Sequence, residues 1–131
     1  MEMEIFFEGA KKVNALYKGH LHRTDQPVAE GGENSAPSPF DVFLASIGTC
    51  AGFYVKTFCD QREIPTDKIK LIQTLEVDRE KHLISKIKID IKLPPDFPEK
   101  YRESLINVAG LCAVKRTIAN PPSFEIITTN S

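Results

Sequence analysis

The sequence has little of three things: charge of one sign, cysteine and long uncharged runs. Its 131 residues hold 17 basic and 18 acidic side chains, and this balance argues against nucleic acid or an anionic membrane as the main partner, because both select a basic excess. Three cysteines are too few for a disulfide scaffold, and an odd number leaves one unpaired in a secreted monomer. We therefore expect a cytoplasmic protein, in which each cysteine is either a small buried residue or a reactive thiol.

No targeting or membrane-spanning segment is predicted. The first residues alternate acidic and apolar side chains, whereas a signal peptide is basic and then continuously apolar. The longest uncharged run, Val42–Val55, has 14 residues, whereas a bilayer span needs about 20. We interpret this run as a helix buried on most sides, within one domain over residues 1–131.

The pattern of apolar residues predicts an α+β fold with the order ββ-α-ββ-α-α-β. Alternating apolar residues on both sides of a turn predict two hairpins, and Ser38 and Pro39 are typical of a helix start. Asp96 and Glu99 have the spacing of a capping box. The predicted elements are a hairpin over 1–21, a loop over 24–38, a helix over 39–63, a hairpin over 69–93, a helix from 96, a helical piece over 111–119 and a strand over 123–129.

Cys50 lies in the middle of the predicted central helix, in the string ASIGTCAGF. Gly48 and Gly52 flank it, and each glycine inside a helix costs roughly 1 kcal/mol relative to alanine. Two such residues around one thiol indicate that something packs closely there, such as another helix or a second copy of the chain. Cys50 itself is either a small core residue or a reactive thiol, and composition alone favours neither.

The other two cysteines differ in their surroundings. Cys59 follows Cys50 by nine residues, which places it on the opposite face of the helix and about 13.5 Å further along, too far for a disulfide. We interpret Cys59 as a packing residue. Cys112 opens a short helical piece and precedes Lys115 and Arg116, a position that favours a thiolate. Cys50 and Cys112 are free to meet in space, and two thiols on two helices are the minimal arrangement for redox cycling.

Other chemistry finds little support in the sequence. His20 and His22 point the same way on a strand, but no third ligand has a recognisable spacing, so we interpret them as surface residues. The sequence has neither a glycine-rich phosphate loop between a strand and a helix nor a serine–histidine–aspartate order. No cofactor and no metal are predicted.

Two strings resemble those of the OsmC/Ohr family, the osmotically inducible and organic hydroperoxide resistance proteins. GGENSAPSPFDVFLASIGTC, Gly31–Cys50, is similar to the family's glycine-containing loop and the buried helix that carries its reactive cysteine. GLCAVKRTIANPPSFEI, Gly110–Ile126, is similar to its second cysteine with the helix, proline turn and final strand that follow. The order of the elements agrees over nearly the whole chain.

The resemblance implies an OsmC-like fold, an intertwined homodimer with two sites at the subunit interface, and thiol-dependent peroxidase activity. It implies that Cys50 attacks an organic hydroperoxide and becomes a sulfenic acid, which then condenses with Cys112. A dithiol reductant restores both thiols.

The sequence departs from the family at the groups that activate the thiol. A free thiol has a pKa of about 8.5 and is only a few per cent ionised at pH 7. The family's peroxidases use an arginine of the first hairpin, held by a glutamate near the helix start. Here Lys11 or Lys12 stands at the arginine position, with Arg23 the only arginine of the hairpin. Phe40 occupies the glutamate position, and Asp41 is the nearest carboxylate.

This departure keeps two other functions in consideration. One is a protein of the same scaffold that binds a small apolar or thiol-reactive ligand at the dimer interface. The other is a thiol–disulfide or thiol-transfer enzyme, which ranks last because the sequence has no CxxC motif.

Overall fold

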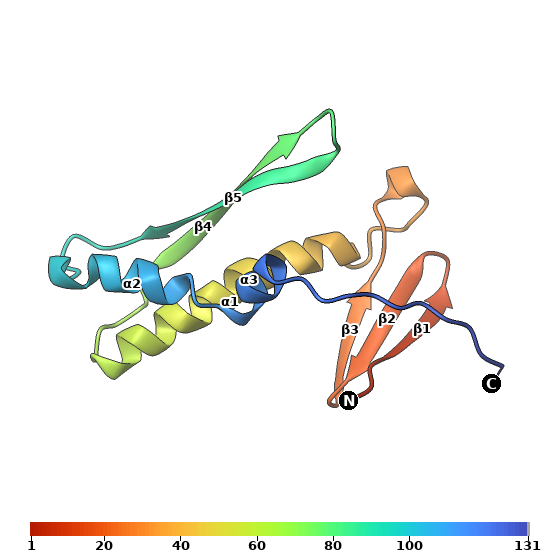
Figure 1. Ribbon diagram of the computed structural model, residues 1–131, viewed down its shortest axis with the longest axis horizontal. Coiled ribbons are helices and arrows are strands. Elements are labelled where there is room, and N and C mark those ends of the chain that lie inside the picture. The colour runs from red at the N-terminus through yellow and green to blue at the C-terminus, as the bar shows by residue number, and fades with distance from the viewer. Residues whose placement is uncertain (131) are drawn as a thin grey trace. The chain divides into compact units, whose positions relative to one another are not determined.

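The computed structural model describes residues 1–130, and its fold is α+β, as predicted (Figure 1). The chain divides into two compact units, Met1–Ala45 and the residues from Ser46 onward. The elements are β1 (Glu4–Gly9), β2 (Lys12–Tyr17), β3 (His20–Thr24), η1 (Val28–Glu30), α1 (Pro39–Gln61), β4 (Lys70–Asp78), β5 (Leu83–Lys92), η2 (Glu99–Tyr101), α2 (Arg102–Ala109) and α3 (Ala113–Ala119), where η marks a 3-10 helix.

The first unit contains an antiparallel sheet in the order β1-β2-β3. The sequence predicts one strand across 13–21, but the structure splits this stretch at Lys18 and Gly19, whose φ angles are 50° and 80°. Two residues with positive φ form a hairpin turn that suits the twist of the strands. The prediction was wrong because apolar residues keep alternating through the turn. After the turn, Leu21 pairs with Leu16 of β2 and so shares the face of Leu16, not the face of Val13 and Ala15.

Helix α1 begins where the sequence predicts. The Ser38 hydroxyl accepts a hydrogen bond from the backbone N–H of Asp41 at 3.3 Å, which caps the first turn. By length and composition alone, this 23-residue helix could cross a membrane, but core helices of soluble proteins pass the same test. Its buried residues recur at the spacing of one helical face: Ile47, Ala51, Val55, Phe58 and Cys59.

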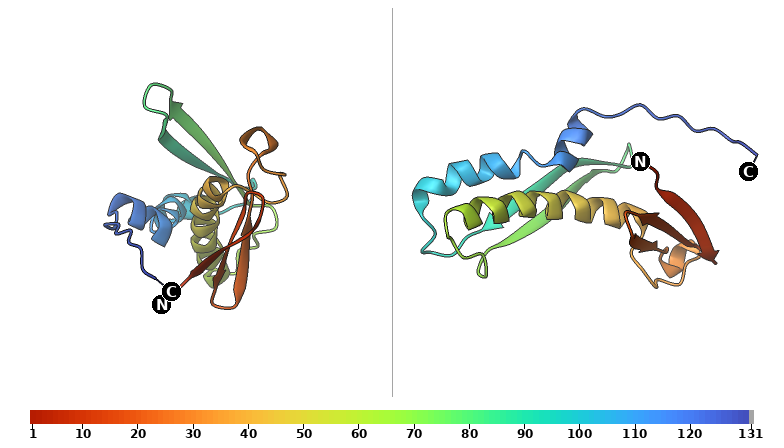
Figure 2. Two further views of the ribbon diagram at one scale, coloured as in Figure 1. Left: turned by 90° about the vertical axis from the view of Figure 1, so that its right-hand side faces the viewer. Right: turned by 90° about the horizontal axis from the view of Figure 1, so that it is seen from below.

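The core of the second unit lies among α1, α2 and the β4–β5 hairpin (Figures 1 and 2). β4 and β5 pair antiparallel, as predicted. The Arg62 guanidinium lies 3.6 Å from the centroid of the Phe58 ring and donates a hydrogen bond to the Phe58 carbonyl oxygen at 3.0 Å. The buried cluster consists of Val55, Phe58, Cys59, Phe97 and Leu105.

Helix α2 begins later than the capping-box pattern predicts. Phe97 is buried, and its backbone N–H donates to the Pro94 carbonyl oxygen at 3.1 Å, so the chain makes a turn where the helix was expected to start. A 3-10 turn over Glu99–Tyr101 follows, and the α-helix starts only at Arg102. The cap at Asp96 is therefore a wrong prediction.

The predicted final strand, 123–129, is not formed. Residues 121–130 have no regular secondary structure, and Phe124 and Ile126 are 85% and 94% exposed. A strand needs a neighbour for its backbone N–H and C=O groups. Within residues 1–130, the two sheets contain only β1–β3 and β4–β5, so residues 123–129 are paired with no strand of this chain.

Candidate functional site

Cys50 lies near the middle of α1 and is half-buried. Its two flanking glycines have different surroundings. A Cβ atom at Gly48 would lie 2.8 Å from Oε1 of Gln73, so Gly48 makes room for a side chain of β4. A Cβ atom at Gly52 would meet nothing within 4 Å. The close packing predicted from the two glycines is therefore found within this chain only at Gly48.

Cys59 lies fully inside the core, with 0% of its surface exposed. Burial raises the pKa of its thiol, and the Asp60 carboxylate acts in the same direction, while Lys56 and Arg62 oppose the change. A buried, protonated thiol is a poor nucleophile, because the thiolate is the reactive form. These features support the interpretation of Cys59 as a packing residue.

Cys112 is the N-cap residue of α3, as its predicted place at the start of a helical piece requires. Its Sγ accepts a hydrogen bond from the backbone N–H of Lys115 at 3.3 Å, and only 1% of the residue is exposed. The Lys115 ammonium group donates to the Gly110 carbonyl oxygen at 3.3 Å. The sulfur is thus surrounded by protein and has a backbone donor directed at it.

The structure holds Cys50, Cys59 and Cys112 as free thiols. Cys50 and Cys112 both belong to the second unit, Cys50 half-buried on a long helix and Cys112 buried at the start of a short one. The two candidate redox cysteines therefore differ in exposure, with the proposed attacking thiol the more accessible one.

Two of the three candidate cations of the first unit, Arg23 and Lys12, are paired with carboxylates. Arg23 Nη1 lies 3.2 Å from both carboxylate oxygens of Glu8, and a hydrogen bond from Asn14, together with Arg23, lowers the pKa of that carboxyl. Lys12 Nζ lies 2.6 Å from a carboxylate oxygen of Glu33, and this bond raises the pKa of the ammonium group. Lys12 and Arg23 are thus each held in place by a carboxylate.

The loop that follows β3 is organised by a residue that the sequence analysis did not select, Asp25. Its carboxylate is 0% exposed and accepts hydrogen bonds from the Ser35 hydroxyl at 2.6 Å and from the backbone N–H groups of Ser35, Gln26 and Glu33 at 3.0, 2.8 and 3.3 Å. These bonds, those from Ser35 first, lower the pKa of Asp25 from 3.8 to about 2. The signal in the sequence is an acidic residue at the end of a strand, before a loop rich in glycine and proline.

The same loop brings Glu33 to Lys12. Because Asp25 fixes the Glu33 backbone N–H, it also fixes the start of the side chain that holds the Lys12 ammonium group. Gly32 allows the loop to close, since a Cβ atom there would lie 2.0 Å from the Gln26 carbonyl oxygen. The loop, the ion pair and Asp25 therefore form one connected structure in the first unit.

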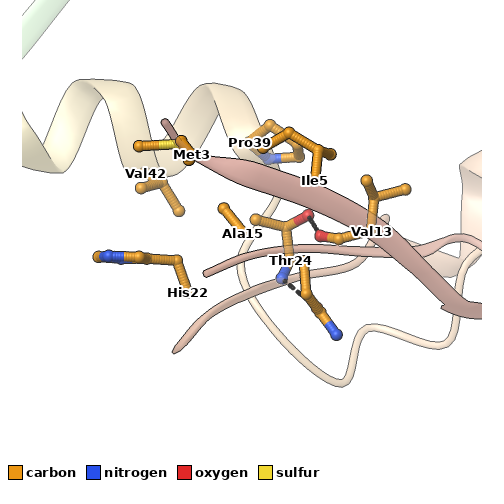
Figure 3. Close-up of a pocket in the computed structure, with 9 residues that line it drawn as sticks. Met3, Ile5, Val13, Ala15, His22, Thr24, Pro39 and Val42 are labelled. Atoms are coloured by element: carbon orange, nitrogen blue, oxygen red, sulfur yellow. Dashed lines mark hydrogen bonds between the residues drawn. The ribbon is translucent and has the colours of Figure 1, made fainter. Parts of the chain in front are cut away.

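A largely apolar hollow of about 350 Å³ lies in the first unit (Figure 3). Side chains from all three strands and from the first turn of α1 line it, and it contains no cysteine. His22 is at this hollow, whereas its predicted partner His20 is not among the lining residues. Within residues 1–130, no group of three or more metal-ligating side chains is found. The labelled lining residues are Met3, Ile5, Val13, Ala15, His22, Thr24, Pro39 and Val42.

A second hollow, of about 360 Å³, lies in the second unit beside Ala51, the residue that follows Cys50. Its lining is mostly apolar, from β5 and α2, and includes the charged side chains of Asp90 and Arg102. Both charges are paired, since Asp90 lies 2.8 Å from Lys92 and Arg102 lies 2.6 Å from Glu99. The hollow is therefore a mainly apolar space with a balanced pair of charges.

Solved structures with the same fold come from several bacteria. A protein of Psychrobacter arcticus 273-4, named for osmotic stress induction and a detoxification response, has a TM-score of 0.73 at 20% identity, with 88% of this chain and 85% of that chain covered. The OsmC-like protein of Mycoplasma pneumoniae has a TM-score of 0.70 at 12% identity, covering 92% and 87%. The organic hydroperoxide resistance protein OhrB of Bacillus subtilis has a TM-score of 0.53 at 20% identity, covering 92% and 93%.

The sequence comparison agrees with the fold. No curated protein matches the sequence, but the family model described as OsmC-like protein matches residues 32–127. This range includes helix α1 with Cys50, the β4–β5 hairpin and α3 with its cap at Cys112. The chain therefore belongs to the family of OsmC-like proteins.

Proposed function

We propose that this protein is a thiol-dependent peroxidase that reduces organic hydroperoxides, with Cys50 as the attacking and Cys112 as the resolving cysteine. Membership in a family that includes organic hydroperoxide resistance proteins supports a role in peroxide chemistry. The observation that carries the assignment is the contrast in exposure among three free thiols: Cys50 is half-buried, whereas Cys59 and Cys112 are buried. Of the two thiols on α1, only Cys50 is open to a substrate.

The proposed reaction has two steps. The Cys50 thiolate attacks the peroxide oxygen of ROOH, the O–O bond breaks, and the alcohol ROH leaves after taking a proton, which oxidises the sulfur to a sulfenic acid. The Cys112 sulfur then attacks the sulfenic sulfur, water leaves, and a 50–112 disulfide forms. A dithiol reductant exchanges with this disulfide and restores both thiols.

In this proposal a cation stabilises the thiolate; the resemblance implies an arginine of the first hairpin, and Lys11, Lys12 and Arg23 are the residues to test. Lys12 and Arg23 are the stronger candidates, because Glu33 and Glu8 hold them in place. The rate at which Cys50 reacts with iodoacetamide, measured from pH 5 to 10 in Lys11→Ala, Lys12→Ala and Arg23→Ala, identifies the cation. The variant that lacks the stabilising cation is expected to show a rate profile whose midpoint lies at a higher pH. If all three variants have the wild-type profile, the hairpin does not supply the cation.

The proposal also includes a cytoplasmic homodimer of single-domain chains. A reducing compartment keeps all three thiols available. Many apolar side chains are exposed and could be covered by a second copy, among them Phe53, Phe124 and Ile126, at 64%, 85% and 94%. Exposed apolar side chains gathered on a soluble protein mark surfaces that bind another protein.

The direct test is peroxide consumption coupled to a dithiol reductant. Cys50→Ser is expected to abolish turnover, whereas Cys112→Ser is expected to stop after one equivalent with Cys50 as a sulfenic acid. Cys59→Ser is the matched control, because it removes a thiol from the same helix and is expected to leave turnover unchanged. Intact mass after peroxide treatment detects the 50–112 disulfide. Unchanged turnover in Cys50→Ser contradicts the assignment.

A second candidate function is the binding of a small apolar ligand without turnover. The hollow beside Ala51 favours it, because its lining is mostly apolar and its two charges are already paired. Binding of an environment-sensitive apolar dye, with Ala51→Phe as the variant that fills the hollow, tests it. Dye binding that Ala51→Phe abolishes, in a protein that consumes no hydroperoxide, favours the binding protein over the peroxidase.

A further inference from the structure

Cys112 has a second task besides its proposed redox role, which is to hold the first turn of α3. Its Sγ accepts the backbone N–H of Lys115 at 3.3 Å, the side-chain bond that an N-cap residue makes to the third residue of a helix. The first N–H groups of a helix have no partner inside it. Because only 1% of Cys112 is exposed, water has little access to the Lys115 N–H and cannot easily replace the sulfur as its acceptor.

Helix α3 has few other interactions that keep it folded. It has only seven residues, Ala113–Ala119, and none of them is buried. Isolated helices of this length are marginal in water, and most helices in proteins are stabilised by packing. At its other end, the backbone N–H and the side-chain amide of Asn120 both donate to the Arg116 carbonyl oxygen, at 3.0 and 3.1 Å. At the N-terminal end, the sulfur of Cys112 accepts the Lys115 backbone N–H, and the Lys115 ammonium group donates to the Gly110 carbonyl oxygen.

Oxidation in the proposed reaction changes this sulfur, so the inference rests on the proposed function. The thiol of Cys112 gives up its proton and forms a bond of about 2.05 Å to Cys50 Sγ, and the dihedral angle about that bond must lie near ±90°. The oxidant is the organic hydroperoxide, which leaves as an alcohol, and water leaves in the second step. The position of Sγ is then set by its bond to Cys50 and no longer by the Lys115 N–H.

We propose that formation of the 50–112 disulfide removes the cap of α3 and unfolds the helix, so that the redox state of Cys112 controls the order of the chain from Ala113 onward. The segment affected continues into residues 121–130, which already lack regular structure. Its exposed apolar side chains, Phe124, Ile126 and Ile127, are then no longer tethered by a folded helix. The oxidised protein thus differs from the reduced one at the C-terminal end as well as at the thiols.

Amide hydrogen exchange read by mass spectrometry tests the switch on peptides that cover Ala113–Ala119. In the dithiothreitol-reduced protein these amides are expected to be protected. After one equivalent of cumene hydroperoxide they are expected to exchange roughly tenfold faster or more. Peptides around Val55, in the core of the second unit, serve as the internal reference and are expected to stay unchanged.

Three variants separate the cap from the disulfide. Cys112→Ala removes the acceptor without oxidation, so its reduced form is expected to exchange like the oxidised wild type. Cys112→Ser keeps an N-cap acceptor and forms no disulfide, so α3 is expected to stay protected with and without peroxide. Cys50→Ser keeps the Cys112 thiol and is expected to stay protected after peroxide.

The outcomes distinguish this inference from the proposed function. If intact mass shows the loss of about 2 Da that a disulfide requires but α3 exchange does not change, the switch is refuted and the peroxidase stands. If no disulfide forms, both fail. If reduced Cys112→Ala is as protected as Cys112→Ser, Cys112 does not hold α3, and the switch is refuted whatever the peroxide experiment shows.

Discussion

Replacing Gly52 by alanine tests whether a second copy of the chain packs beside Cys50. A Cβ atom at Gly52 meets nothing within 4 Å in this chain, so the change creates no clash within the monomer. Alanine is favoured over glycine inside a helix by about 1 kcal/mol, and the free energy of unfolding of the monomer is expected to rise by about that amount. If the proposed homodimer places a partner helix against Gly52, the added methyl group overpacks that contact at a cost of about 1–3 kcal/mol.

The two effects have opposite signs and separate readouts. Sedimentation equilibrium is expected to show a dimer dissociation constant about 5- to 150-fold higher for Gly52→Ala, the equivalent of 1–3 kcal/mol. Urea unfolding at a concentration below the dissociation constant is expected to show a more stable monomer. Gly48→Ala is the control, since its Cβ would lie 2.8 Å from Oε1 of the Gln73 side chain, a contact within the same chain. An unchanged dissociation constant for Gly52→Ala, with a more stable monomer, would refute the close packing inferred from this glycine.

Three further predictions concern the structure that supports the site. Asp25→Asn is expected to loosen the loop after β3, with roughly tenfold faster exchange of the Glu33 and Ser35 amides that bond to Asp25. Because the folded pKa of Asp25 lies below its ordinary value, its stabilising effect is present above about pH 3.8 and disappears as the pH falls to about 2. Between these pH values, the free energy of unfolding is expected to depend less on pH in Asp25→Asn than in the wild type. The same pH dependence in both proteins would contradict a stabilising role for the Asp25 carboxylate. Arg62→Met is expected to cost about 1 kcal/mol in urea unfolding by removing the guanidinium from the Phe58 ring. Arg62→Lys keeps the charge and is expected to lose less, and equal losses would show that the charge over the ring contributes nothing. Leu105→Ala, at a side chain 1% exposed in the core, is expected to cost roughly 2–5 kcal/mol, and a loss below about 1 kcal/mol would mean that the core relaxes to fill the space.

The elements that the sequence predicts correctly are those whose stabilising contacts are local. The apolar spacing of α1 and the Ser38 hydroxyl at its start lie within a few residues of one another, and the β4–β5 hairpin pairs residues close in the sequence. The final strand at 123–129 was wrong for the opposite reason, because strand propensity does not show whether a partner strand exists. The cap at Asp96 was wrong because burial of Phe97 determines where the chain turns.

The site shows the same limit. Cys50 and Cys112 could be selected from neighbouring residues and from the resemblance, and their roles stay predictions. Asp25 was not selected, since its place between a strand and a loop does not reveal its importance, which lies in donors up to ten residues away whose convergence depends on the fold of the loop. The ion pair between Lys12 and Glu33, 21 residues apart, follows from that same loop and has no signal in the sequence.

The Asp25 carboxylate also limits how this stretch of the gene can change. Surface loops usually tolerate insertions and deletions, but here one side chain binds the N–H groups of both Glu33 and Ser35, and a residue added before them moves both donors away. Proline has no N–H and is excluded at both positions. Gly32 cannot gain a side chain, because the Gln26 carbonyl oxygen occupies that space. We therefore expect the number of residues in this loop to be conserved as strictly as the volume of side chains in a protein core.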